Sequence, residues 1–241
     1  MSTVLITGAS RGLGLEFVRQ YAADGWNVIA ACRAPDKAAE LQMLAQNKNV
    51  RIEALDVISA PSIATLAAKL KDTAIDVLIN NAGVFSGTGR DGRHFMEAED
   101  TTQSFGTLDP VAWDKVLQAN AIAPIMVTQA LVPNILKGKD RKIIMITSRM
   151  GSIEMAKEGD IAYRSSKAAL NAAMKNISIT LKSDQVIVVS FHPGWVKTDM
   201  GGANAEITPG ESIAGMRKVI VGLTMKDSGK FLGYDGKIYP W

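Results

Sequence analysis

The chain contains a single cysteine and only two histidines among its 241 residues. Cys32 alone cannot build a disulfide framework or a cluster of thiolate metal ligands. His94 and His192 stand far apart in the sequence, without the close spacing of ligand residues that metal sites use. We therefore expect no structural disulfide and no bound metal.

Runs of like charge and long hydrophobic stretches are also missing. The net charge is +3, and the basic residues are scattered rather than gathered into the patch that marks a nucleic-acid-binding protein. No apolar run approaches the ~20 residues that span a bilayer, and no secretion signal is visible at the N-terminus. The expectation is a cytoplasmic protein that binds neither nucleic acid nor membrane.

Apolar residues make up 47% of the chain, which is enough for one large core. Short apolar runs typical of buried strands alternate with segments of helical periodicity. Strands are expected at 4–6, 28–31, 50–55, 75–79, 143–146, 186–191 and in the tail 230–241, and the longest helices at 110–136, 161–183 and 209–225. This alternation predicts an α/β fold, a doubly wound parallel sheet of about seven strands in one domain over residues 1–241.

A glycine-rich turn follows the first expected strand. Residues 7–14 read Thr-Gly-Ala-Ser-Arg-Gly-Leu-Gly, and a helical pattern begins directly after them. Such a turn gathers free backbone N–H groups and the positive end of a helix, which together favour a phosphate. Gly8 permits the tight turn, Gly12 leaves room for a pyrophosphate, and Gly14 lets the helix pack close to the sheet. The alternative is an ordinary strand–helix turn.

A phenol and an ammonium group lie four residues apart on an expected helix, at Tyr163 and Lys167. At this spacing they share one helix face, where a cation is expected to lower the pKa of the phenol and suit it to proton transfer near neutral pH. Ser148 lies just past the end of a buried strand, where ligands bind in parallel sheets. The alternatives are a chance pair on a surface helix and a capping serine.

These features fall in a known order along the chain. The motifs are Thr7-Gly-x-x-x-Gly12-x-Gly14, Asp56-Val57, Asn80-Asn-Ala-Gly83, Asn120, Ser148, Tyr163-x-x-x-Lys167 and Pro193-Gly194. The chain resembles the short-chain dehydrogenases/reductases over essentially its whole length. It is most similar to their C-factor/sniffer-like carbonyl reductases, in segments such as Ser148-Arg-Met-Gly-Ser-Ile153 and the terminal Pro240-Trp241. The interval from Ser148 to Tyr163 is slightly longer than the family's commonest spacing, which requires a larger loop.

The resemblance implies a Rossmann fold and a role for each matching residue. Tyr163 would be the acid/base, Lys167 would lower its pKa and hold the nicotinamide ribose, Ser148 would orient the carbonyl, and Asn120 would complete a proton relay through water. The residues implied to bind the cofactor are Gly8, Ser10, Arg11, Gly12, Leu13, Gly14, Arg33, Asp56, Val57, Asn80, Ala82, Gly83, Tyr163, Lys167, Pro193, Gly194, Val196 and Thr198. Asp56 matches the position at the adenine edge, and Asn80 the position that braces the sheet.

The sequence offers a physical reason for the relay. Pro124 lies four residues after Asn120 and has no N–H, so the Asn120 carbonyl would lose its partner in an α-helix. A freed carbonyl in a kinked helix could hold an ordered water near Lys167. The alternative is that Pro124 only kinks the helix for packing.

The residues after the second strand indicate which nicotinamide nucleotide is bound. An acidic residue there would bind a ribose 2′-hydroxyl and repel a 2′-phosphate. The chain has Arg33 instead, and Arg11 in the glycine turn is well placed to help it bind a phosphate. Asp36 follows Pro35 and is better explained as a first-turn helix residue. We expect NADP(H) rather than NAD(H), with a solvated surface Arg33 as the alternative.

The sequence therefore predicts an NADPH-dependent carbonyl reductase that acts on a small ketone or aldehyde. Two alternatives remain: an NADP(H)-binding signalling or sensor protein of C-factor type with incidental turnover, and an alcohol dehydrogenase that uses the same site in the opposite direction.

The substrate would be recognised by segments 84–109, 148–161 and 199–211, the last with a mobile lid at Gly201-Gly202. A homodimer through the two long helices is the family's habit. His192 is expected to be a buried, satisfied residue, Trp195 a packing residue or a cofactor contact, and residues 97–100 a solvated face.

Overall fold

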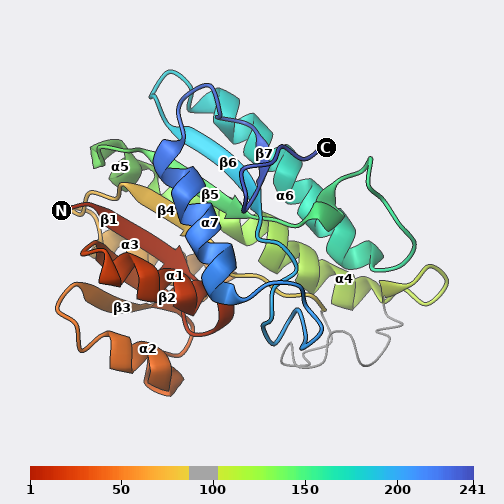
Figure 1. The fold of residues 1–241 in the computed structure, drawn as a ribbon, viewed down its shortest axis with the longest axis horizontal. Coiled ribbons are helices and arrows are strands. Elements are labelled where there is room, and N and C mark those ends of the chain that lie inside the picture. The colour runs from red at the N-terminus through yellow and green to blue at the C-terminus, as the bar shows by residue number, and fades with distance from the viewer. Residues whose placement is uncertain (87–102) are drawn as a thin grey trace.

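The structure, a computed structural model, describes residues 1–86 and 103–241. Seven parallel strands form one sheet in the order β3-β2-β1-β4-β5-β6-β7 (Figure 1). The strands are β1 (Thr3–Thr7), β2 (Asn27–Cys32), β3 (Val50–Ala54), β4 (Val77–Asn80), β5 (Lys142–Ile146), β6 (Ile187–His192) and β7 (Phe231–Gly233). The predicted fold class is confirmed, including the short last strand in the tail.

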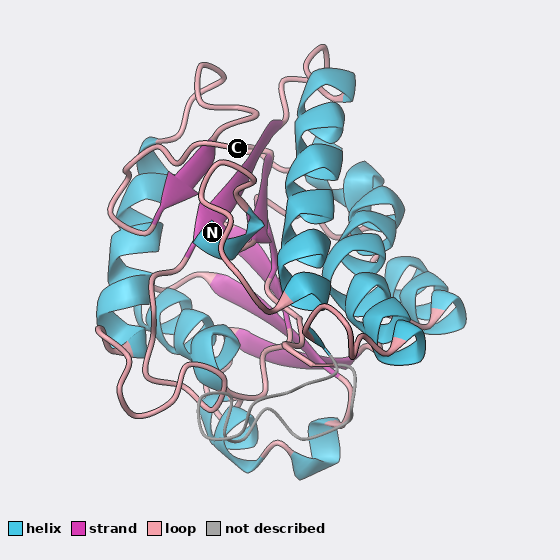
Figure 2. Cartoon of the chain, turned by 90° about the vertical axis from the view of Figure 1, so that its right-hand side faces the viewer, coloured by secondary structure: helices cyan, strands magenta, loops and turns pink. Residues whose placement is uncertain are grey.

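Helices cover both faces of the sheet (Figure 2). They are α1 (Gly12–Ala23), α2 (Ala39–Leu44), α3 (Ala60–Lys69), α4 (Pro110–Leu117), α5 (Ala123–Lys137), α6 (Ile161–Thr180) and α7 (Pro209–Gly222), with the short elements η1 (Pro35–Lys37), η3 (Gln118–Ile122) and η4 (Arg149–Gly151). Because both faces are covered, the central strands are buried on both sides and are apolar almost throughout.

The hydrophobic core is divided by the sheet into two parts. On one face, α1, α2 and α7 contribute buried side chains such as Phe17, Leu41 and Met216. On the other face, α3, α5 and α6 contribute side chains such as Leu66 and Leu131. Because these strands are parallel, the carboxyl ends of β1, β2 and β4 lie at one edge of the sheet.

The long helix expected at 110–136 is interrupted. It consists of α4 and α5 joined by η3, a π-helical turn in which the N–H of Ala123 donates to the carbonyl of Gln118. Pro124 follows directly and has no N–H to donate, so the ordinary α-helical ladder cannot continue through it. The sequence correctly places the disturbance, but it appears as a π turn.

By averaged hydropathy, the stretch Pro110–Lys137 is long and apolar enough to cross a membrane. The sequence expectation concerned uninterrupted apolar runs, which this stretch does not form. Half of its most apolar window is buried inside the protein, where Val127, Leu131 and Ile135 belong to the core. The core helix of a globular protein meets the same length and composition requirement.

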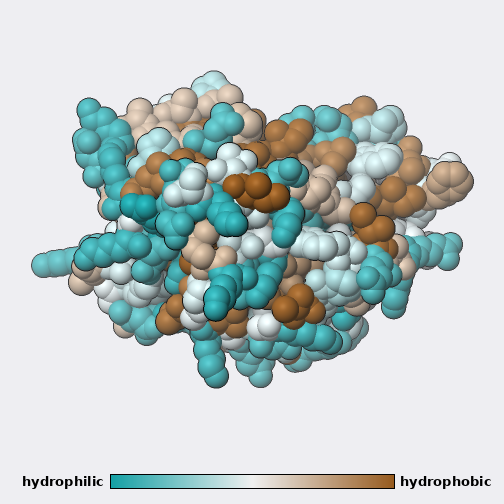
Figure 3. All heavy atoms as spheres, turned by 90° about the horizontal axis from the view of Figure 1, so that it is seen from above, coloured by the Kyte–Doolittle hydropathy of each residue, from teal (hydrophilic) through white to brown (hydrophobic). Residues whose placement is uncertain are grey.

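The upper surface mixes hydrophobic and hydrophilic side chains in small groups (Figure 3). Exposed hydrophobic residues in the described parts of the chain include Ile179 on α6 and Val221 on α7. Hydrophobic side chains scattered in this way are normal on protein surfaces and need no special explanation.

Candidate functional site

The glycine-rich turn is locked against the end of β4. The Asn81 side chain donates from Nδ2 to the carbonyls of Thr7 (3.0 Å) and Gly8 (3.3 Å). A Cβ added to Gly8 would lie 2.8 Å from the Cα of Ala82, and one added to Gly14 would lie 2.2 Å from the carbonyl oxygen of Gly8. No side chain fits at either position, because the neighbouring atoms are backbone. Asn81 has this role although the sequence analysis gave it none.

The helix that follows the turn begins without a cap. In α3, α4 and α7, a Ser, Asp or Thr side chain accepts a hydrogen bond from a first-turn N–H. In α1 the N-cap residue, Arg11, makes no such bond, and the first turn holds no acidic residue. The amides at this end of α1 are therefore left for another acceptor, which fits an anionic group such as a pyrophosphate.

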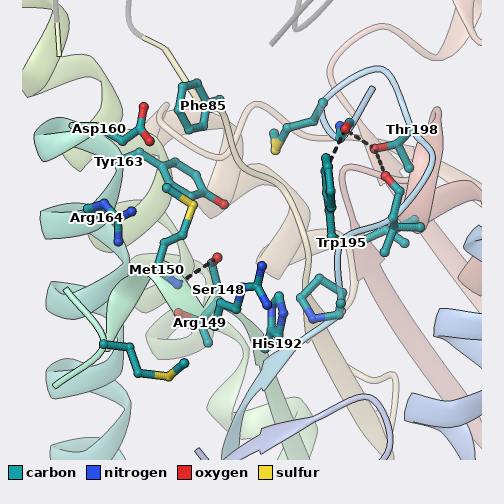
Figure 4. Close-up of a pocket in the computed structure, with 18 of the residues that line it drawn as sticks. Phe85, Ser148, Arg149, Met150, Asp160, Tyr163, Arg164, His192, Trp195 and Thr198 are labelled. Carbon is teal, nitrogen blue, oxygen red and sulfur yellow. Dashed lines mark hydrogen bonds between the residues drawn. The ribbon is translucent and has the colours of Figure 1, made fainter. Parts of the chain in front are cut away.

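Tyr163 and Lys167 share one face of α6 and lie beside the end of β5. The Lys167 ammonium lies 5.6 Å from the centre of the Tyr163 ring and donates to the Ile146 carbonyl (3.0 Å). Ser148 lies beside Tyr163 and acts on its pKa, and it also caps η4 by accepting from the Met150 N–H (3.2 Å). Figure 4 shows the Tyr163 and Ser148 hydroxyls facing the same space. Ser148 is therefore a capping residue, as the alternative stated, and it also lies beside Tyr163.

Burial dominates the electrostatics of this pair. It raises the pKa of Tyr163 to about 12, although the neighbouring Ser148 lowers it, and it lowers the pKa of Lys167 to about 8. The expectation that the lysine lowers the pKa of the tyrosine is therefore wrong for the protein alone. The lysine would lose its proton before the tyrosine does, so it offers no cation at the pH where the phenol ionises.

Asn120 lies directly behind this pair in the π turn. Its side chain accepts from the Val84 N–H (2.8 Å) and donates to the Val84 carbonyl (2.7 Å) and to the Ser166 hydroxyl (3.0 Å). A Cβ added to Gly83 would lie 3.0 Å from the Asn120 side-chain oxygen and 3.6 Å from Lys167 Nζ. The amide thus ties the end of β4 to α6 beside the lysine.

The segment after β6 closes the other side of the site. A Cβ added to Gly12 would lie 3.7 Å from Thr198 Cγ2, which puts Thr198 against the glycine turn. Arg11 and Asp199 form an exposed ion pair (3.4 Å) across the same gap. Trp195 donates from its indole N–H to the Gly201 carbonyl (2.8 Å). The structure thus brings together the two ends of the predicted site, which are more than 180 residues apart in sequence.

A single cavity of about 610 Å³ connects these parts. Among the predicted site residues it is lined by Leu13, Ser148, Tyr163, Pro193, Gly194, Val196 and Thr198. It is also lined by residues that the sequence analysis did not single out, namely Phe85, Arg149, Met150, Met155, Lys157, Asp160, Arg164 and Met200. Most of these lie in segments 148–161 and 199–211, so the sequence located loops that line the cavity but not the individual side chains.

The other predicted cofactor residues lie along the carboxyl ends of the strands. Arg33 is exposed directly after β2, beside the glycine turn, because the Ala9 N–H donates to the Ala31 carbonyl (3.1 Å). Asp56 and Val57 follow β3, and Asp36 lies in η1 as expected. Asn80 is buried in β4 and donates to the Thr128 hydroxyl (3.0 Å). Ser10 lies in the glycine turn, and Ala82 follows β4.

Two predictions of the sequence analysis, for His94 and for Glu97 to Asp100, lie outside the described residues. Within residues 1–86 and 103–241, no group of three or more His, Cys, Asp and Glu side chains that could hold a metal ion occurs. The absence of a metal from the protein stays a prediction.

Comparison with known protein families settles the wider relationship. The family model for short chain dehydrogenases matches residues 2–207. The chain belongs to this family. The short-chain dehydrogenases are oxidoreductases, and the order of motifs along this chain is that of the family.

Individual relatives agree with this assignment. The C-signal protein of Myxococcus xanthus is 40% identical over 168 residues, which are 69% of this chain and 93% of the relative. Two solved structures superimpose on the whole chain: the carbonyl reductase Sniffer of D. melanogaster (34% identity, TM-score 0.88, 100% of both chains) and an NADPH-bound carbonyl reductase from chicken fatty liver (36% identity, TM-score 0.85, 100% of this chain and 99% of that one).

His192 is a buried residue in the wall of the cavity. It lines the cavity at the end of β6, is only 6% exposed, and packs edge-on against the Tyr239 ring. The expected burial is confirmed, and the buried Nδ1 atom has no hydrogen-bond partner among the described residues. Burial, with a contribution from Arg149, lowers the pKa of His192 to about 4, against a smaller opposing effect of Asp235.

This histidine should make the protein sensitive to mild acid. A group that stays neutral in the folded state but takes up a proton when unfolded costs stability as the pH falls below its ordinary value of 6.5. Between pH 7 and pH 5 we expect a loss of about 2 kcal/mol in the free energy of unfolding from His192 alone. Urea unfolding of the wild type and of His192→Gln at both pH values measures it. An equal loss in the glutamine variant would assign the acid sensitivity to other groups.

Proposed function

We propose that the chain is an NADPH-dependent carbonyl reductase that passes hydride to a ketone or aldehyde while Tyr163 protonates the oxygen. The observation that carries this proposal is the single cavity that joins Leu13 of the glycine turn to the hydroxyls of Ser148 and Tyr163. We further propose that one domain, residues 1–241, carries both the cofactor and the substrate sites. Its partner in the reaction is a small carbonyl compound.

The residues present fit a dinucleotide. The uncapped end of α1, with Gly8, Ser10, Arg11, Gly12, Leu13 and Gly14, would hold the pyrophosphate. Asp56 and Val57 would contact the adenine, and Asn80 would brace the sheet near the cofactor. Ala82, Gly83 and Lys167 would support the nicotinamide ribose, and Pro193, Gly194, Val196 and Thr198 would contact the nicotinamide. When bound, the reduced cofactor supplies the hydride.

The raised pKa of Tyr163 suits the role of an acid. At pH 7 the phenol keeps its proton, since its pKa is about 12, and the nearby lysine, whose pKa is about 8, is mostly cationic. The phenol can therefore give its proton to a substrate oxygen while a cation stands near the phenolate that forms. Ser148, beside the phenol, would hold the same oxygen by a hydrogen bond. The reverse direction, alcohol oxidation, would first require removal of the phenol proton at a cost set by this high pKa.

We propose that Asn120 takes part in resupplying that proton. Pro124 cannot donate to the Asn120 carbonyl, and the π turn changes the helix ladder at this point, which supports a seat for an ordered water near Lys167. The Asn120 side chain is already used by Val84 and Ser166, so only its backbone carbonyl is proposed to hold the water. A high-resolution crystal structure with that carbonyl bonded within the helix would contradict this role.

Arg33 is proposed to set the choice of NADPH over NADH. Its guanidinium is exposed beside the glycine turn, where a 2′-phosphate would lie, and no acidic residue replaces it. Replacing Arg33 by Asp removes a phosphate ligand and adds a repelling charge. We expect the ratio of kcat/KM for NADPH over NADH to fall by a factor on the order of a thousand and to reverse. An unchanged affinity for NADPH would show that another residue binds the phosphate.

The experiment that tests the function is oxidation of NADPH in the presence of ketones, aldehydes, diones and quinones, with NADH as the comparison cofactor. Turnover that requires NADPH would support the reductase. Rapid reduction of NADP+ by alcohols with negligible carbonyl reduction would instead support the alcohol dehydrogenase.

The similarity to the C-signal protein keeps one other class of function under test, an NADP(H)-binding signalling or sensor protein with incidental turnover. Tight binding of NADPH with no turnover across the panel would favour it. A homodimer through α5 and α6 also stays a prediction. Sedimentation would test it. A cytoplasmic location stays an expectation.

A further inference from the structure

The side chains that line the cavity, among the described residues, carry more positive than negative charge. Arg149, Lys157 and Arg164 line it, with Asp160 as the acidic residue among the described lining residues. Arg164 is engaged, since its Nε donates to the Gly159 carbonyl (3.1 Å). Arg149 and Lys157 are exposed to solvent, and their side chains form neither an ion pair nor a hydrogen bond within the described residues.

The remaining wall of the cavity is apolar and adaptable. Phe85 packs against Tyr163 with its ring tilted by 40° and the ring centres 4.7 Å apart. Met150, Met155 and Met200 add unbranched side chains that can follow the shape of a ligand, and Trp195 supplies a flat wall opposite Tyr163. Such a wall suits a substrate with an extended or aromatic hydrophobic body.

Arg149 lines the cavity beside His192. It follows Ser148 directly in sequence, and Figure 4 shows its guanidinium beside His192, below the space between Tyr163 and Trp195. Its positive charge lowers the pKa of His192 and of Tyr239, and the negative charge of Asp235, in the C-terminal segment, raises the pKa of both. A guanidinium that faces a cavity without a carboxylate partner offers two parallel N–H donors to an incoming anion.

We propose that the substrate is an amphipathic carbonyl compound whose carboxylate is bound by Arg149, with Lys157 adding positive charge at the cavity mouth. This inference rests on the reductase function proposed above and names its substrate class. The hydrophobic body would lie against the methionines and Trp195, and the carbonyl would face Ser148 and Tyr163. The carboxylate then fixes which end of the substrate points outward.

The test compares phenyl-substituted keto acids of increasing chain length with their methyl esters, which have the same carbonyl but no charge. The wild type should prefer the acid at the chain length that reaches Arg149, and added salt should weaken that preference. In Arg149→Gln the ratio of kcat/KM for acid over ester should fall about tenfold. Lys48→Gln removes the same charge from an exposed loop before β3, at the opposite edge of the sheet, and should keep the wild-type ratio.

Calorimetric titration of the acid and the ester into the protein with NADP+ separates binding from turnover. Loss of acid binding in Arg149→Gln supports the anion site, whether or not any compound is reduced. If the wild type binds the acid but reduces no compound, the anion site stands and the reductase function fails. Reduction of acid and ester with equal efficiency, or a preference for the acid that Arg149→Gln leaves unchanged, overturns the proposed site while the reductase stands. Weaker binding of NADPH in Arg149→Gln would make Arg149 a cofactor residue and also overturn it.

Discussion

Replacing Tyr163 by phenylalanine is expected to lower the rate of carbonyl reduction by about 10²–10⁴-fold, the usual contribution of a general acid. The phenylalanine ring fills the same buried space, since Tyr163 is 8% exposed and packs against Phe85. The hydroxyl beside Ser148 is the only group removed. Steady-state kinetics with the best carbonyl found in the panel measures the effect.

The variant must also retain its cofactor for the result to concern proton transfer. NADPH binding, followed by nucleotide fluorescence, is expected to stay near the wild-type affinity, because the phenol is proposed to act on the substrate oxygen. A variant that reduces carbonyls at close to the wild-type rate would contradict the role of Tyr163. A variant that loses both binding and turnover would show that the hydroxyl mainly supports the cofactor site.

Replacing Gly14 by alanine should damage both stability and cofactor binding. The new methyl group would lie 2.2 Å from the Gly8 carbonyl oxygen and 2.6 Å from Asn81 Nδ2, so α1 or the glycine turn has to move. Forced overpacking of this kind costs about 3 kcal/mol. We expect a matching loss in the free energy of unfolding and at least a tenfold loss in NADPH affinity, measured by urea unfolding and by titration.

Gly222→Ala is the matched control. Gly222 ends α7, and a Cβ there meets nothing within 4 Å. Alanine is the better helix former by about 1 kcal/mol, so this variant should be as stable as the wild type or slightly more stable. If Gly14→Ala behaved like Gly222→Ala, the close approach between α1 and the turn would not be needed for the fold or the cofactor.

The succession of strands and helices along the chain and the glycine turn could be predicted from the sequence because both depend on local patterns. Short apolar runs and helical periodicity define the elements, and Gly8 and Gly14 have no alternative once their neighbours are known. The role of Asn81 could not be predicted in this way. Its side chain bonds to residues more than 70 positions earlier in the sequence, and only the folded sheet brings them together.

The electrostatics of the site were the least predictable part. The spacing of Tyr163 and Lys167 correctly placed them together, but the sign of the shift in the tyrosine pKa depends on burial, which a pair of residues does not reveal. The lowered pKa of His192 could not be predicted for the same reason, because it depends on the residues that surround the end of β6. The individual side chains of segment 148–161 that reach the cavity depend on the path of an irregular loop, which has no periodicity to read.

In the strand order β3-β2-β1-β4-β5-β6-β7, β2 and β3 are added on one side of β1, and β4 to β7 are added on the other side. The direction in which successive strands extend the sheet therefore reverses between β1 and β4. Arg33 and Asp56 follow strands on one side of this reversal, whereas Ser148, Arg149 and His192 follow or end strands on the other. The residues proposed to determine nucleotide specificity and those proposed to determine substrate specificity are thus encoded in separate stretches of the gene. Selection can alter one specificity by substitutions that leave the other untouched, so a single ancestral chain could diversify its substrates while it kept the same supply of reducing equivalents.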